Sequence, residues 1–80
     1  MIQDKSLNYT VVFEASPEGG YVVYVPTLPG LVTQGETIEE ARMMAKDAIE
    51  GYLAVLKEDG EEIPVESGDT VVSKVTAIAP

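Results

Sequence analysis

Carboxylate side chains are the groups in this chain that could do chemistry, because Asp and Glu make up 14 of its 80 residues. A hard cation such as Mg²⁺ needs a few converging carboxylates, and such a site could support a metal-dependent nuclease. Glu14, Glu50 and Asp69 are the candidates, since each lies in or beside a different predicted element. Glu14 falls on the polar side of an alternating segment, however, and Glu50 on the polar side of a helical pattern. We therefore predict no metal site and keep the nuclease as the weakest alternative.

Histidine and cysteine are both absent from the chain. Without histidine, the usual general base and the commonest metal ligand are missing, and neither a Ser-His nor a Cys-His nucleophile can be assembled. Without cysteine, there is no disulfide and no thiolate metal site, which agrees with a reducing compartment. The sequence thus predicts a protein that is not an enzyme and that has no catalytic residue and no cofactor.

The formal net charge is -9, from fourteen acidic and five basic residues. A field of this sign repels phosphate backbones, so we predict no direct contact with nucleic acid, and it attracts basic proteins. The predicted contact surface for a basic partner is the acidic loop together with acids on the outward side of the helix: Glu61, Glu62, Glu66, Glu50 and Asp47. The alternative is that the charge only keeps a small protein in solution.

Hydrophobic periodicity predicts the elements that position these side chains. Apolar residues alternate with period two over residues 7–15 and fill residues 21–25, which predicts a β-hairpin around the Pro-Gly-rich turn between them. Thr37 and Glu40 form a capping box before a helical stripe that ends near Gly60. We predict one α+β domain over residues 1–80 in the order β-β-β-α-β, with strands at 7–15, 21–25, 31–34 and 70–79 and a helix from Ile38 to Lys57 or Glu58.

A single helix covers only one face of a sheet, and the other face would then expose an apolar patch that includes Val72. A second subunit is the simplest cover, so we predict a homodimer or homotetramer. Gly51 lies in the middle of the helix, where glycine costs about 1 kcal/mol relative to alanine. It is either a tolerated defect or a point of close approach between subunits. The predicted oligomer interface contains Val12, Val22, Tyr24, Met44, Gly51 and Val55.

No apolar run approaches the roughly 20 residues that cross a bilayer, so no membrane contact is predicted. The first residues, Met-Ile-Gln-Asp-Lys, lack the basic and apolar regions of a signal peptide. The predicted location is therefore cytoplasmic.

One combination of residues is characteristic of a known family. Two stretches of the sequence resemble the N-terminal domain of the HicB antitoxin family, also described as UPF0150. They are YTVVFEASPEGGYVVYVPTLPGLVTQGETIEEA and, after it, AKDAIEGYLAVLKEDGEEIP. The resemblance covers residues 8–64. It rests on Tyr9, Gly20-Tyr21, Leu28-Pro29-Gly30, Thr33-Gln34-Gly35, Gly60 and Ile63-Pro64.

The resemblance implies a partial, degenerate ribonuclease-H-like fold and self-association. It also implies a partner: HicA, a small basic toxin that cleaves mRNA and whose active surface the antitoxin covers. Thr27 stands where the family commonly has Asp, and Leu31 where Cys or another small residue is frequent. Complete antitoxins often carry a C-terminal DNA-binding segment, whereas this chain is expected to have none.

The function predicted from these observations is that of an antitoxin in a type II toxin-antitoxin system, which binds and neutralises a HicA-type mRNA interferase. The alternative is an orphan homo-oligomeric module of the same fold with another binding role. A short gene for a basic protein beside this one would favour the antitoxin.

Overall fold

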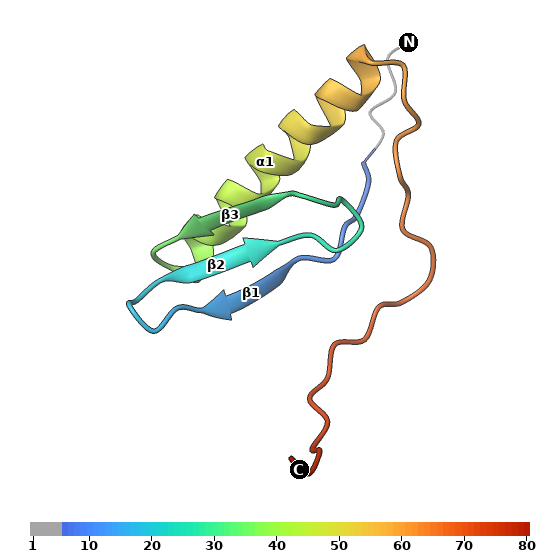
Figure 1. Cartoon of the computed structure of the whole chain (residues 1–80). Coiled ribbons are helices and arrows are strands. Elements are labelled where there is room, and N and C mark those ends of the chain that lie inside the picture. Colours follow the sequence, from blue (N-terminus) through green and yellow to red (C-terminus); the bar gives the residue numbers. More distant parts are fainter. Residues whose placement is uncertain (1–5) are drawn as a thin grey trace.

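The computed structural model describes residues 6–80 and consists of a three-stranded sheet backed by one helix (Figure 1). The strands are β1 (Val12–Ala15), β2 (Tyr21–Tyr24) and β3 (Val32–Gly35), all antiparallel in the order β1-β2-β3, and the helix is α1 (Ile38–Glu58). The predicted α+β class and the order β-β-β-α are therefore confirmed. The prediction about a signal peptide concerns residues 1–5, which lie outside the described residues.

The hairpin of β1 and β2 closes through a glycine turn. The Ser16 N–H donates to the Gly20 carbonyl at 2.9 Å, and the Gly19 N–H donates to the Ser16 carbonyl at 3.0 Å. Gly20 has φ +75°, and a Cβ there would lie 2.8 Å from the Gly35 carbonyl oxygen. Both the left-handed backbone and the close approach require glycine at this position.

The first strand begins at Val12 rather than at the predicted Leu7. Val12 pairs with Tyr24, and the same register continued outward would place Thr10 opposite Pro26. Proline has no N–H to donate to the ladder, so the pairing stops there. Residues 7–11 continue in the direction of β1 without strand partners.

The punctuated segment between β2 and β3 contributes to the core. Two successive turns fold this segment back on itself. In the first, the Leu28 N–H donates to the Val25 carbonyl at 3.0 Å, and in the second, the Leu31 N–H donates to the Leu28 carbonyl at 3.2 Å. Leu28 is completely buried as a result. The prolines and glycine of this segment thus shape a loop that carries a core leucine.

The helix begins and ends as the sequence predicts. The Thr37 hydroxyl accepts the Glu40 N–H at 3.1 Å, and the Glu40 carboxylate accepts the Glu36 N–H at 3.1 Å. At the other end Gly60 has φ +71° and its N–H donates to the Lys57 carbonyl. These contacts satisfy backbone groups that would otherwise be unpaired at the two helix ends.

The core lies between α1 and the sheet and is small. One cluster joins Val23 of β2 to Ala41 and Ala45 of α1, and a second joins Val25, Leu28 and Leu31. The helix packs mainly on β3 and β2. Partly buried side chains extend the two clusters, among them Val11, Phe13, Ile49 and Leu53.

The prediction of a last strand over residues 70–79 is wrong. Residues 70–80 form no strand in the structure, and the segment leaves the sheet after Gly68, whose φ is +79°, and runs away from the domain (Figure 1). The β-branched composition that predicted a strand is a preference for extended backbone on a packed surface. In this chain alone the segment has no such surface, so it is extended but unpaired.

Candidate functional site

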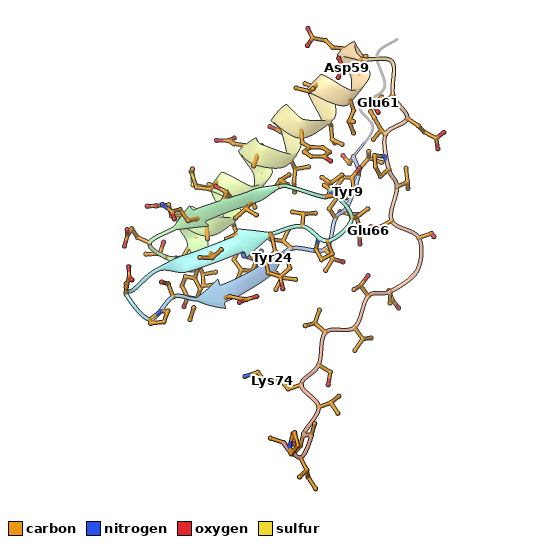
Figure 2. The ribbon with its side chains drawn as sticks, in the orientation of Figure 1. Tyr9, Tyr24, Asp59, Glu61, Glu66 and Lys74 are labelled. Atoms are coloured by element: carbon orange, nitrogen blue, oxygen red, sulfur yellow. The ribbon has the colours of Figure 1, made fainter. Side chains whose placement is uncertain are left out.

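A carboxylate clasp fastens the chain after the helix to the start of the sheet. The Glu66 Oε2 accepts the Thr10 N–H at 2.6 Å and the Thr27 hydroxyl at 2.9 Å, while Oε1 accepts the Thr10 hydroxyl at 2.7 Å. The Tyr9 hydroxyl donates to the Pro64 carbonyl beside it (Figure 2). Thr10 is 56 positions from Glu66, Tyr9 is 55 positions from Pro64, and Thr27 is 39 positions from Glu66, so these bonds fix where the chain leaves the domain.

The clasp changes the acidity of two of its members. The hydrogen bond from the Thr10 hydroxyl is the main cause that lowers the pKa of Glu66, with the Thr10 N–H next, because both favour the ionised carboxylate. Burial raises the pKa of the Tyr9 phenol, and the negative charge of Glu66 adds to that effect. The clasp is therefore built around an ionised Glu66.

Glu66 was predicted as part of a partner contact, and its oxygens are occupied within the chain. From the sequence, Thr27 was noted only as a departure from the family pattern. Neither Thr10 nor Thr27 was predicted to donate a hydrogen bond to Glu66. The available signal was that a threonine at position 27 can donate to a carboxylate, whereas the common aspartate would repel it. Thr27 and Glu66 thus form a matched pair across the β2–β3 turn.

The other predicted acids lie on the surface of the helix and beyond its end. Glu61 and Glu62 are exposed just after the C-terminus of α1, close to Glu58 and Asp59, as the labels of Asp59 and Glu61 show in Figure 2. Lys57 is the only basic residue in the last turn. Acids near the negative end of a helix are unfavourable by about 0.3–1 kcal/mol each at low salt. Helix stability therefore does not explain this group, which we call the acidic end: Glu58, Asp59, Glu61 and Glu62.

Asp47 and Glu50 are also exposed, more than one helical turn before the acidic end. Glu50 forms an i,i+4 pair with Lys46 at 3.7 Å, with both side chains largely in solvent. Such pairs contribute only a few tenths of a kcal/mol. Every acidic residue described by the structure except Glu66 is exposed, so the negative charge lies at the protein surface.

The outer face of the sheet carries an apolar row. Val12, Tyr24 and Val32 are aligned partners across the three strands, and Val22 lies on the same face. Val32 is 64% exposed and Val22 is 39% exposed. A hydrogen bond with the carboxylate of Glu14 is the main cause that raises the pKa of the Tyr24 phenol. The structure thus places the predicted Val12, Val22 and Tyr24 together, and it adds Val32.

The other three predicted interface residues, Met44, Gly51 and Val55, share one exposed stripe of α1. A Cβ at Gly51 would meet no atom within 4 Å. Nothing within this chain requires glycine there, so both interpretations of Gly51 stay open as predictions.

A groove of about 670 Å³ runs between α1 and residues 6–13, which lead into and begin β1. It exists because the helix packs mainly on β3 and β2 and leaves the inner side of β1 uncovered. Val11, Phe13, Ile49 and Leu53 form its apolar lining, and Arg42 and Lys46 are among its polar residues. The free outer edge of β1 borders the same region of the fold.

Residues 6–80 contain no group of three or more side chains that could hold a metal ion. Glu14, Glu50 and Asp69 are therefore not brought together, and the nuclease alternative loses its proposed site. None of the helices in this part of the chain is both long enough and apolar enough to cross a bilayer.

The fold and the site define a small α+β interaction domain with an acidic surface. The sequence profile described as HicB_like antitoxin of bacterial toxin-antitoxin system matches residues 9–76. The chain belongs to this HicB-like antitoxin family.

Curated relatives fall into two groups. A UPF0150 protein of Thermoplasma acidophilum is 42% identical over 65 residues, which are 81% of this chain and 94% of that protein. A UPF0150 protein of Archaeoglobus fulgidus is 45% identical over 62 residues, covering 75% and 90%. Antitoxin HicB of Escherichia coli K12 is 43% identical over 61 residues, which are 76% of this chain but 44% of the antitoxin. The chain thus spans nearly the whole of these two UPF0150 proteins but less than half of antitoxin HicB of Escherichia coli K12.

Proposed function

We propose that this chain is an antitoxin that binds a small basic ribonuclease of the HicA type and neutralises it by covering its active surface. Membership of the HicB-like antitoxin family carries the proposal. The 43% identity with antitoxin HicB supports it over the length of this domain. The interaction belongs in the cytoplasm, where an mRNA-cleaving toxin has its substrate.

The acidic end is the proposed first point of contact, with Asp47 and Glu50 extending the surface along the helix. Four carboxylates beside a helix C-terminus repel one another and the helix dipole. A basic partner would relieve this repulsion, because opposite charges steer diffusional encounter and fix orientation. Glu66 contributes indirectly, by holding the chain in place beyond the acidic end.

The test uses the product of the neighbouring gene, if that gene encodes a small basic protein. Both proteins are co-expressed, purified through a tag on the toxin, and assayed for RNA cleavage with and without this chain. We expect a stable complex that suppresses cleavage. A basic neighbour that cleaves RNA equally well at a several-fold molar excess of this chain would refute the proposal.

Charge variants then locate the contact. Glu61→Lys with Glu62→Lys should slow association by roughly 10-fold or more at low salt, with a smaller effect at high salt. The matched control is Glu18→Lys with Glu36→Lys, which changes the net charge equally near the opposite end of α1. Equal slowing by both variants would show that only net charge matters, and would contradict the acidic end as the contact.

A second function is favoured by one observation: the chain spans nearly the whole of its UPF0150 relatives. It would then be a self-associating interaction module without a toxin. Absence of any complex with the basic neighbour, in a chain that still self-associates, is the outcome that would select this alternative.

A further inference from the structure

This chain is far more extended than a compact domain of its length, and its last twelve residues, which run away from the sheet, contribute to the difference (Figure 1). The radius of gyration is 15.3 Å, whereas a compact 80-residue domain has about 12 Å. The chain exposes 6792 Å², and a compact protein of 8.6 kDa exposes about 4,700 Å². Roughly 2,000 Å² of surface is therefore available to a partner. We call residues 69–80 the arm.

The arm has the composition of a strand in a packed sheet. Its large apolar side chains are Val71, Val72, Val75 and Ile78, and only Asp69 and Lys74 carry charged side chains. In an extended segment Val71, Val75, Ala77 and Ala79 share one side with Ser73, whereas Val72 and Ile78 lie on the other side with Lys74. Val71 is 85% exposed, Val75 is 88% exposed and Ile78 is 97% exposed. A β-branched segment whose large apolar side chains lie in solvent gains from pairing with a sheet edge, where part of them can be buried.

The body of the domain offers a matching edge. Within residues 6–80, β1 is paired only with β2, so no strand of this part of the chain pairs with the backbone groups on its outer side. On the helix side of this edge lies the groove with Val11 and Phe13 on its lining. A strand added beside β1 would satisfy those backbone groups, and its apolar side would cover the groove.

The chain's own arm does not take this position. The clasp holds Glu66 at Thr10, and Gly68 then directs the arm away from its own sheet (Figure 1). Within residues 6–80, no hydrogen bond joins the arm to the body. The arm's twelve residues, fully extended, reach about 40 Å, which is enough to cross to a second molecule.

We propose that two copies of this chain exchange arms, each arm adding as a strand to the outer edge of β1 in the other copy. Val71, Val75 and Ala77 then cover the groove between β1 and α1 of the partner. The surplus of roughly 2,000 Å² per chain is larger than the roughly 800 Å² that each partner buries in a standard interface, so the exposed surface is large enough for a stable dimer. This inference is independent of toxin binding.

The first test measures the mass of the full chain in solution by light scattering, without any partner. We expect a dimer at micromolar concentration. Val71→Asp with Val75→Asp should weaken the dimer by roughly 100-fold or more, because two carboxylates would replace valines packed against the apolar part of the groove lining, which includes Val11 and Phe13. The helix signal in circular dichroism should be unchanged, since Val71 is 85% exposed and Val75 is 88% exposed in their own chain. The control, Thr70→Asp with Thr76→Asp, adds the same charge on the other side of the strand and should weaken the dimer much less.

A second test separates exchange from an arm that folds back. The natural chain has no cysteine, so Val75→Cys in a tagged copy and Ala15→Cys in an untagged copy can be mixed, refolded together and oxidised. A disulfide between tagged and untagged chains at these two positions supports exchange, and the double variant in one chain should link between chains rather than within one. Three outcomes would each overturn the proposal. They are a natural chain that is monomeric, a dimer that Val71→Asp with Val75→Asp does not weaken, and a disulfide that forms only within one chain. An arm protected only after the basic partner is added would overturn it too, since the occupant would then be the toxin.

Discussion

Gly51→Ala distinguishes the two interpretations of the glycine in the middle of α1. Alanine is favoured over glycine in a helix interior by about 1 kcal/mol, because glycine loses more backbone freedom on folding. A Cβ at this position meets no atom within 4 Å, so the added methyl group brings no clash within the chain. We therefore expect Gly51→Ala to stabilise the protein by about 1 kcal/mol, which is about 4–8 °C in Tm for a domain of this size.

Thermal unfolding followed by circular dichroism measures the effect, and light scattering on the same samples follows self-association. Gly35→Ala is the contrasting control, because a Cβ there would lie 2.5 Å from the Ala41 backbone nitrogen and 2.7 Å from its Cα. Those atoms belong to the first turns of α1 and cannot move aside, so we expect Gly35→Ala to lower Tm. A Gly51→Ala protein that is destabilised, or that dissociates at concentrations where the natural chain is dimeric, would refute the reasoning. It would place Gly51 at a subunit contact.

Two further predictions concern the clasp. The folded-state pKa of Glu66 is lowered, so its stabilising contribution is present above the unfolded value and is lost as the pH falls through the folded value. Glu66→Gln should therefore lower the urea midpoint at pH 7 and leave it nearly unchanged at pH 2–3; an equal loss at both pH values would contradict the ionised clasp. Thr27→Asp should destabilise the fold at neutral pH by placing a second carboxylate against Glu66. Combining it with Glu66→Gln should recover much of the loss, and additive losses would argue against direct contact.

The elements that depend on local pattern were predictable from the sequence. The capping box at Thr37 and the glycine at position 60 mark the ends of α1 because the hydrogen bonds they make are local. The alternation in the first two strands correctly separates Val23, which faces the helix, from Val22, which does not. The start of β1 was predicted too early, since it depends on Pro26, a residue in the other strand.

The clasp could not be predicted because its members are distant in sequence. Thr10 and Thr27 have no property that distinguishes them from other surface threonines until the fold brings Glu66 between them. Charge led to the opposite expectation, in which Glu66 belongs with Glu61 and Glu62 on the partner surface. Its half-buried position and its three hydrogen bonds instead give it a structural task, whatever partner binds nearby.

The last strand was predicted wrongly for the same reason that the clasp was missed: local sequence does not show which distant residues a segment meets. A high content of valine, isoleucine and threonine indicates that a segment favours a pleated, half-buried environment, but it carries no information about which chain supplies that environment. In residues 70–79 the preference is as strong as in the three formed strands, yet the sheet edge is not reached within one molecule. Only six apolar residues of the described chain are buried, while Val71, Val75 and Ile78 remain in solvent. A chain with so little core and so much unplaced strand is more consistently explained as half of an assembly than as a finished monomer. The arm and the uncovered groove beside β1 are the two halves of the contact that such an assembly requires.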